Sequence, residues 1–438
     1  MRSAEAWRAA LAAALISLLA ACGGGNSTET TITGGGFSGG QVGPEVSIQA
    51  PQGANTTEIV VDNGPGAGFV LGVANLPYVT VKVCAPGSTT QCTTIDHVFL
   101  DTGSIGFRVL RSQVAGLGLP AMTSGNRTVA ECYPFVVGAV WGALARADLG
   151  VGGELAANLP VQIIDDGAPA QLAPPTDCLN AAAGSLLTSM AKLQAKAVLG
   201  IGMLRYDCGL VCDQGLYTNS YTLYYGCDSA SNCQPLAVPA EAQVQNPVTF
   251  FAQNNNGSIV ILPAVPDTGA SVARGRLVFG IGTQTNNQLG PSTTVLQVET
   301  DPASPSYLYL TTTQAGTHYD FSYIDSGSNG LFFDDASLST HCVASGGGSA
   351  WYCPPVLQLR SATLQDRLGH QASVDLAIAN ADVLFGTSNT AFSNLGGAAG
   401  AANPGAFVWG LPFFFGKQVY TAIWGQALAQ NGPWFAFQ

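Results

Sequence analysis

One short pattern occurs once in each half of the chain, and it limits the fold more than any other feature of the sequence. Residues 101–104 read Asp-Thr-Gly-Ser and follow the apolar run 98–100, whereas residues 325–328 read Asp-Ser-Gly-Ser and follow the largely apolar run 321–324. Each copy predicts a buried strand that delivers a carboxylate into a tight turn, where glycine allows two backbones to come close. The two aspartates lie 224 positions apart (325 minus 101) in a chain of 438 residues, which indicates one copy in each half.

Composition favours an all-β chain with many turns and few short helices. Only 10% of the residues are charged and 54 are glycine, while short β-branched runs are frequent. One short helix is expected over 185–194. The net charge of −12 argues against nucleic acid or an anionic membrane surface as a partner. We expect two β lobes, 49–245 carrying Asp101 and 246–438 carrying Asp325.

The same order of segments recurs in both halves. A long hairpin is predicted over 128–153, and in the second half two strands at 257–262 and 275–280, each beginning with glycine, flank a loop. Downstream of its aspartate, each half has an apolar-apolar-Gly segment, at 198–200 and at 408–410. This shared order favours a duplicated β lobe over two unrelated domains.

The amino terminus predicts export. Arg2 and Arg8 precede an apolar run, Leu11–Ala21, that is too short to span a bilayer permanently. With Cys22 directly after it, this run resembles a bacterial lipoprotein signal over residues 1–21, and the resemblance implies that Cys22 becomes the lipid-bearing first residue. The alternative is an ordinary secretory signal that happens to end in cysteine.

Lipidation would place the protein at the bacterial cell envelope. Gly23 favours export to the outer membrane under the usual sorting rule for such signals. Residues 22–48 predict a flexible tether rich in Gly, Ser and Thr. We therefore expect a chain bound to the membrane through a lipid at Cys22, on the periplasmic or the surface face.

Ten of the 11 cysteines remain when Cys22 is set aside, an even number that suits disulfides in an oxidising compartment. Short loops favour the pairs Cys84–Cys92 and Cys342–Cys353. The cluster Cys208, Cys212, Cys227 and Cys233 is expected to pair within itself, which leaves Cys132 for Cys178. A zinc site in this cluster is the alternative, although its spacings fit common zinc knuckles poorly.

The two Asp turns and the two apolar-apolar-Gly segments, taken in order, resemble the pepsin-like aspartic peptidases. The resemblance runs from about residue 75 to the carboxyl terminus, and it implies a bilobal double-β-barrel in which each lobe supplies one catalytic aspartate. The hairpin that ends at 148–153 is similar to the flap of that family, which closes over substrate. The chain also resembles bacterial lipoproteins of this architecture whose function is uncharacterised.

This resemblance implies a monomeric hydrolase that cuts peptide or protein substrates with a water molecule held between Asp101 and Asp325, without a metal or cofactor. Two carboxyl groups at such a short distance cannot both ionise, so the pair shares a proton. One member would activate the water and the other would donate a proton to the scissile carbonyl. The supporting residues implied are Ser104 and Ser328, which orient the carboxylates; Thr102 and Ser326, which tie the two loops together; and Gly103 and Gly327, the glycines of the motif.

The flap and the strand after the first turn depart from the family pattern. Gapless spacing puts Phe135 where the flap tyrosine is usual, and Tyr133 and Trp141 are the other candidates for a substrate-binding aromatic. Arg108 stands where an aromatic residue normally follows the first turn. These departures keep a second function open, that of a pepsin-shaped lipoprotein that binds peptide or envelope material without cutting it.

Two further patterns compete with the Asp turns. Asp267-Thr268-Gly269 repeats the motif, but Pro266 precedes it, and because proline is poorly tolerated in a central strand this segment predicts a hairpin loop. Serine hydrolysis is disfavoured because no Gly-x-Ser-x-Gly elbow is present. The histidines, His97, His318, His341 and His370, are interpreted as structural or exposed.

Overall fold

The structure, a computed structural model, describes residues 42–48, 53–66, 74–167, 171–182, 185–215, 222–291, 293–338, 342, 351–400, 403–426 and 432–438. Strands dominate and the helices are short, so the predicted all-β class is confirmed. Within these ranges, no helix has both the length and the apolar character needed to cross a membrane. Cys22, the signal and most of the predicted tether lie outside the described residues.

Two sheets account for the strands, one of 17 and one of seven. The larger sheet contains β1 (Glu45–Ser47), β2 (Thr56–Val61), β3 (Pro77–Cys84), β4 (Cys92–Asp101), β5 (Ile105–Leu110), β6 (Thr123–Ser124), β7 (Arg127–Phe135), β8 (Gly138–Val151), β9 (Glu154–Ile164), β10 (Ala197–Ile201), β11 (Tyr224–Ser229), β12 (Asn232–Pro235), β13 (Gly257–Ile261), β14 (Val272–Phe279), β15 (Thr294–Gln297), β23 (Gln418–Ala422) and β24 (Trp434–Phe437). The smaller sheet contains β16 (Leu310–Gln314), β17 (Thr317–Ile324), β18 (Leu331–Phe332), β19 (Gln358–Gln365), β20 (Gln371–Ile378), β21 (Gly396–Gly397) and β22 (Ala406–Trp409).

The helices are single turns or little more, and they connect strands. They are α2 (Arg111–Val114), α3 (Thr176–Ala181), α4 (Met190–Leu193), α5 (Leu210–Asp213), α6 (Ala381–Phe385) and α7 (Leu411–Phe414), with 3-10 turns η1 (Ala240–Ala242) and η2 (Pro247–Phe250). The Asn380 side chain caps α6 by accepting a hydrogen bond from the Val383 nitrogen. The strands therefore decide where every candidate site residue lies.

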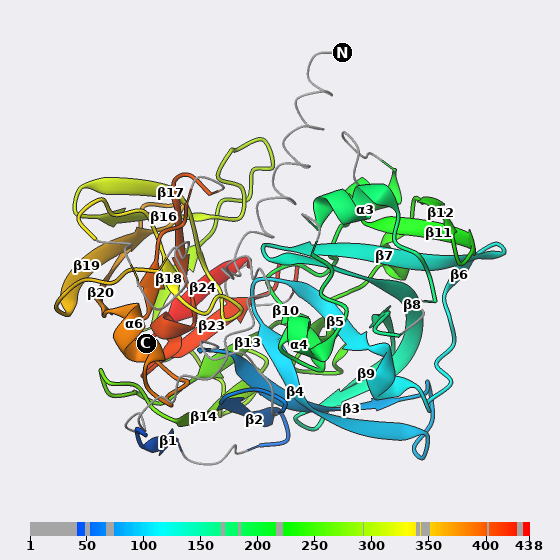
Figure 1. Cartoon of the computed structure of the whole chain (residues 1–438), viewed down its shortest axis with the longest axis horizontal. Coiled ribbons are helices and arrows are strands. Elements are labelled where there is room, and N and C mark those ends of the chain that lie inside the picture. The colour runs from blue at the N-terminus through cyan, green and yellow to red at the C-terminus, as the bar shows by residue number, and fades with distance from the viewer. Residues whose placement is uncertain are drawn as a thin grey trace, which may run out of the picture.

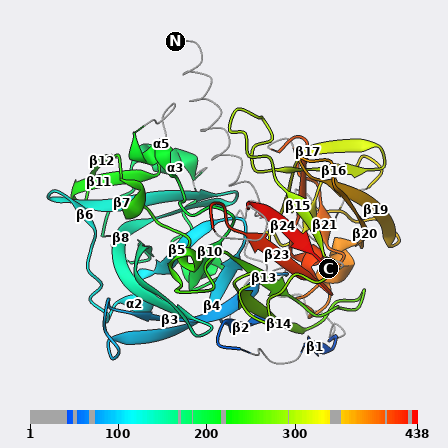
Figure 2. The ribbon, with the colours of Figure 1, turned by 180° about the vertical axis from the view of Figure 1, so that it is seen from behind.

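Two groups of strands lie side by side, with β3–β12 on the right of Figure 1 and β16–β20 on the left. Between them, β2, β14, β13, β23 and β24 form a continuous antiparallel ladder, which Figure 2 shows from behind. The last strands of the chain thus return to pair with strands from its middle. The larger sheet also crosses the predicted lobe boundary at residue 246, because β13–β15 belong to it.

Two local predictions are wrong. The tether predicted to reach residue 48 ends earlier, because β1 pairs in parallel with Val272–Arg274 of β14. The helix predicted over 185–194 is reduced to α4, since residues 185 and 187 hydrogen-bond to the backbone of Ala139 instead. The Ser189 side chain then caps α4, and Gln194, with a φ of 56°, ends it.

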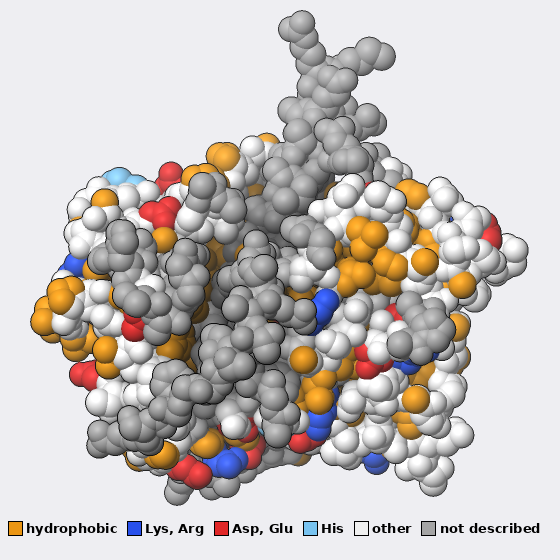
Figure 3. All heavy atoms as spheres, viewed as in Figure 1, with side chains coloured by type: hydrophobic (Ala, Val, Ile, Leu, Met, Phe, Trp, Pro, Cys, Tyr) orange, Lys and Arg blue, Asp and Glu red, His pale blue; other side chains and the backbone are white. Residues whose placement is uncertain are grey.

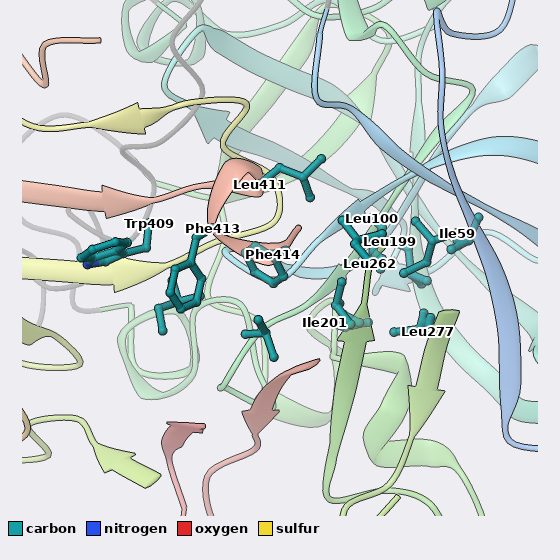
Figure 4. Packing of buried hydrophobic residues seen from close by; sticks show 14 of the residues in the cluster. Ile59, Leu100, Leu199, Ile201, Leu262, Leu277, Trp409, Leu411, Phe413 and Phe414 are labelled. Carbon is teal, nitrogen blue, oxygen red and sulfur yellow. The ribbon is translucent and has the colours of Figure 1, made fainter. Parts of the chain in front are cut away.

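Apolar side chains from both halves share one buried core. Leu100 at the end of β4, Leu199 of β10 and Ile324 at the end of β17 all belong to it. Figure 4 shows part of this core, with Trp409 and the side chains of α7 on one side and Leu100 and Leu199 on the other. Because full burial of one such side chain contributes about 1.5–3 kcal/mol, the core fixes the strands that lead into both Asp turns.

Five disulfides staple the described chain, and their pairing confirms the sequence prediction. They are Cys84–Cys92, Cys132–Cys178, Cys208–Cys212, Cys227–Cys233 and Cys342–Cys353. The four-cysteine cluster is therefore bridged, and the alternative of a zinc site there is wrong, because a disulfide sulfur is no longer a thiolate ligand.

Candidate active site

The first Asp turn is held by three strands. Strand β10 pairs in parallel with the end of β4, where Gly200 lies opposite Asp101, and antiparallel with β5, where Gly200 lies opposite Gly106. A Cβ atom at Gly200 would come within 2.7 Å of the Ile105 nitrogen, so only glycine fits beside the turn. The apolar-apolar-Gly segment 198–200 thus positions the carboxylate.

The second Asp turn repeats this arrangement. Strand β22 pairs in parallel with β17, where Trp409 lies opposite Ile324, and antiparallel with β18, where Trp409 lies opposite Leu331. The Asp325 nitrogen donates to the Trp409 carbonyl at 3.0 Å. A Cβ atom at Gly410 would come within 2.2 Å of the Gly330 oxygen, which again requires glycine.

Each carboxylate accepts two matching hydrogen bonds from its own turn. Asp101 accepts from the Gly103 nitrogen at 2.8 Å and from the Ser104 hydroxyl at 2.5 Å. Asp325 accepts from the Gly327 nitrogen at 2.7 Å and from the Ser328 hydroxyl at 2.7 Å. In both turns the backbone bonds to Oδ1 and the hydroxyl to Oδ2, so the two carboxyl groups are oriented in the same way.

The two turns are joined by reciprocal bonds. The Thr102 nitrogen donates to the Ser326 hydroxyl oxygen at 3.1 Å, and the Ser326 nitrogen donates to the Thr102 hydroxyl oxygen at 2.9 Å. The Ser326 hydroxyl in turn donates to the Leu100 carbonyl at 2.9 Å. The hydroxyl residue after each aspartate therefore ties the two halves together.

The two carboxyl groups face each other across these turns. A Cβ atom at Gly327 would lie 2.5 Å from Asp101 Oδ1 and 3.1 Å from Asp325 Oδ1, so the two oxygens are no farther apart than the sum of these distances. Both aspartates are buried, with exposed fractions of 5% and 3%. Burial and the charge of Asp101 raise the pKa of Asp325 well above its ordinary value, against the hydrogen bonds from Ser328 and Gly327 that lower it. The arrangement can hold one proton between two acids.

A small apolar cavity of about 40 Å³ adjoins the first turn. Thr102 and Gly103 line it together with Tyr133 and Asp207, and Tyr323 reaches it from the second half. A space of this size holds a water molecule or a small group. Of the three flap aromatics predicted from the sequence, Tyr133 is the one that lines this cavity.

Phe135 and Trp141 lie elsewhere. Phe135 pairs with Gly138 at the end of the hairpin, and its ring meets Tyr133 edge-on, with centroids 5.2 Å apart. Trp141 is buried in a separate cluster, packs against Tyr225 and donates to the Leu172 carbonyl at 2.9 Å. Trp141 is thus wrong as a substrate-binding candidate, because its neighbours already enclose its ring and satisfy its N–H.

Arg108 forms a buried charged network beside the cavity, which the sequence did not reveal. Its Nη2 donates to Glu131 at 2.8 Å and to Asp207 at 2.9 Å, and its guanidinium carbon lies 3.5 Å from the centroid of the Tyr133 ring. Tyr224 donates to the other oxygen of Asp207 at 2.7 Å. Arg108, which stands where the pepsin-like family normally has an aromatic residue, therefore packs against the Tyr133 ring.

The network contains two acids, Glu131 and Asp207, and one base, Arg108. Burial and the charge of Glu131 raise the pKa of Asp207 well above its ordinary value, while Arg108 and Tyr224 lower it. A protonated Asp207 leaves Arg108 and Glu131 as a balanced pair. The available signal was a charged residue in an apolar strand, Arg108 between Phe107 and Val109. Nothing comparable marks Asp207.

The competing patterns lie away from the two aspartates. Asp267 and Thr268 sit in the loop between β13 and β14, and Asn394 and Asn389 donate to their carbonyl oxygens. Among the described histidines, His97 contacts Asp62 and Asp96, His318 contacts Thr313, and His370 contacts Asp366. His341 lies outside the described residues.

Comparison with known proteins places the chain in a family without assigning an activity. A family model described as "Protein of unknown function (DUF3443)" matches residues 51–437. Because this match covers most of the sequence, the chain belongs to that family. No curated protein matches the chain.

Proposed function

Starting from membership of the DUF3443 family, whose description assigns no activity, we propose that the protein is an aspartic endopeptidase of the pepsin-like kind. The observation that carries the proposal is the pair of buried, facing carboxyl groups, each held by a glycine nitrogen and a serine hydroxyl from its own turn. A buried acid whose pKa is strongly raised beside a second carboxyl group, as that of Asp325 is, is typical of catalytic sites, and a structural turn has no need of two acids.

The chemistry follows from one proton shared by two carboxyl groups. The ionised member removes a proton from a bound water as the water attacks the scissile carbonyl carbon, and the protonated member donates to the carbonyl oxygen. The carboxyl group that took the water proton then passes it to the amine nitrogen as the C–N bond breaks, and a hydroxyl proton of the intermediate returns to the other carboxylate as the product carboxyl group forms. The proton count belongs to the pair, so neither Asp101 nor Asp325 is assigned one role.

Cleavage of an unfolded protein between pH 3 and 7 tests this proposal. We expect turnover that a statine-containing peptide inhibits, and a loss of about 100-fold or more in Asp101→Asn and in Asp325→Asn. Asp267→Asn is the matched control, because it changes the same Asp-Thr-Gly sequence in a hairpin loop. Equal turnover in all three variants would show that any cleavage comes from another site or a contaminant.

Binding without cleavage is the second candidate, and the Arg108 contact favours it. Tyr133 is only 3% exposed and stacks on a fixed cation, so its side chain lacks the freedom of a closing flap. In that case the statine-containing peptide binds to the wild-type protein with a measurable heat, yet no peptide bond is cut at any pH tested. Peptide binding with turnover instead supports the enzyme.

We also propose that the protein is anchored to the bacterial envelope by a lipid on Cys22, as a monomer. The proposal is supported by the sequence of residues 1–22. Metabolic labelling with an alkyne fatty acid should mark the wild-type protein and leave Cys22→Ser unlabelled and released from the membrane fraction. Labelling of both would show that the lipid, if any, is attached elsewhere.

A further inference from the structure

A second cavity lies in the carboxy-terminal half, and neither Asp101 nor Asp325 lines it. It has a volume of about 620 Å³ and is bounded by β19 and β20, by α7 and by Lys417, the residue before β23. None of its lining residues also lines the cavity beside the first Asp turn. Its volume falls within the range of sites that hold drug-sized ligands, which is about 300–1,000 Å³.

The lining of this cavity is apolar over most of its surface. Nine of the 14 lining residues have apolar side chains, including Trp409, Phe413 and Phe415. The Trp409 indole is fixed by its hydrogen bond to the Thr312 hydroxyl at 3.0 Å. In the view of Figure 3, hydrophobic side chains also gather at the left edge, over β19 and β20, where Leu359 is 74% exposed. Such a lining suits a hydrocarbon chain.

The lining carries two cations, Arg360 and Lys417, and one acid, the exposed Asp375, and one of the cations is left without an acidic partner. Lys417 Nζ lies 5.0 Å from the centroid of the Phe413 ring, and within the described residues no carboxylate forms an ion pair with it. Arg360, by contrast, is paired with Asp335 at 3.6 Å. Burial also lowers the pKa of Lys417, because the charged ammonium group has lost part of its hydration. A bound anion would therefore stabilise the charged form.

We propose that this cavity binds a single-chain amphiphile, with the hydrocarbon chain against Leu359 and Phe413 and an anionic head group at Lys417. Apolar lining and an unpaired ammonium within one cavity match the two ends of such a molecule. A carboxylate and a phosphate head group share this chemistry. Neither aspartate lines the site, so ligand binding can be measured apart from the proposed peptidase activity, but one lining residue, Trp409, also accepts a backbone hydrogen bond from Asp325.

Isothermal titration of the disulfide-intact protein tests the proposal, with laurate and dodecyl phosphate below their micellar concentrations and dodecanol below its solubility limit. We expect saturable 1:1 binding of an anionic probe, with dodecanol at least about tenfold weaker because it lacks the charge-assisted bond. The tighter of the two anions identifies the head group. Shortening the chain should weaken binding by up to about fourfold per methylene removed.

Two variants locate the site, and each has a matched control. Ser361 is exposed and lines the cavity, so Ser361→Trp should block it, whereas Ser373→Trp on the paired strand of the same hairpin should leave binding intact. Lys417→Gln should remove the preference for the tighter anion over dodecanol, while Lys192→Gln, on α4, should not.

The same titrations can overturn the inference. The absence of saturable binding to folded wild-type protein, equal affinity for dodecanol and the tighter anion, or unchanged binding in Ser361→Trp would each refute it. Circular dichroism of each variant confirms folding before titration. Because Asp101→Asn should bind laurate as the wild type does, failure here and failure of the peptidase proposal remain distinguishable.

Discussion

Replacing Arg108 by methionine should destabilise the folded protein by about 3–5 kcal/mol. The side chains of Arg108, Glu131 and Asp207 are all 0% exposed, and the two ion-pair contacts are 2.8 and 2.9 Å long. Methionine keeps most of the apolar volume but leaves two acids without their cation, and removing one partner from a buried ion pair has this cost. The lost stacking on Tyr133 adds to it.

The loss of stability caused by Arg108→Met should be larger at higher pH. The pKa of Asp207 is raised in the folded state, so its contribution to stability is present below its ordinary pKa and is lost as pH rises toward the folded value. Arg108 lowers that folded pKa, and without it the pKa rises further. The destabilisation by Arg108→Met should therefore be larger at pH 7 than at pH 4.

Urea unfolding of the disulfide-intact protein, followed by tryptophan fluorescence at both pH values, measures this effect. Arg274→Met is the control, because the Arg274–Glu58 pair is 3.4 Å long and exposed, with side chains 40% and 50% accessible. An exposed pair contributes about 0–1 kcal/mol. A triple variant, Arg108→Met with Glu131→Gln and Asp207→Asn, should recover much of the loss. Equal effects of Arg108→Met and Arg274→Met would refute the reasoning.

Three further predictions concern the turns, the proton and the disulfides. Gly327→Ala puts a Cβ atom 2.5 Å from Asp101 Oδ1 and should reduce kcat/KM against an unfolded substrate about 100-fold. Gly116→Ala, which has open space around it, should leave kcat/KM unchanged. Cleavage should decline as pH rises through the raised pKa of the pair, because the shared proton is lost; the pH profile of kcat/KM measures it, and a rate that increases into the alkaline range contradicts it. Replacing Cys132 and Cys178 by alanines opens a loop with a sequence separation of 46 and should lower the free energy of unfolding by about 4 kcal/mol in the loop-entropy model. The same change at Cys227–Cys233, with a separation of 6, should lower it by about 2 kcal/mol, and urea midpoints compare the two variants.

The parts of the site that depend on local geometry could be predicted from the sequence. An apolar strand, an aspartate, a hydroxyl residue and glycine specify the turn almost alone, because glycine is needed where the opposite carboxylate comes within 2.6 Å of a Cβ at Gly103. The disulfides were predictable for a similar reason, since most of them close short loops. Once the other cysteines were paired, Cys132 was left for Cys178.

The contacts that join distant segments could not be predicted in this way. Glu131 lies 23 positions from Arg108 and Asp207 lies 99 positions from it, and no periodicity links the three. Tyr133 lines the cavity and Trp141 does not, because one face of the hairpin meets the cavity and the sequence does not show which face it is. Strand β1 was missed because three residues with mixed burial give no pattern, and it exists only through its pairing with β14.

The energetics of the aspartate pair separate a functional site from a structural one. Asp325 is buried with a raised pKa, so as pH rises from its ordinary pKa toward the folded value the folded state loses stability relative to the unfolded state, in which this carboxyl group ionises first. Asp325→Asn removes this loss, and its side-chain oxygen can still accept from the Gly327 nitrogen. We therefore expect Asp325→Asn to raise the urea midpoint at pH 7, to change it little at pH 4, and to abolish cleavage. A lower midpoint at both pH values would instead mean that the carboxylate stabilises the fold, and the argument that only catalysis explains its retention would fail.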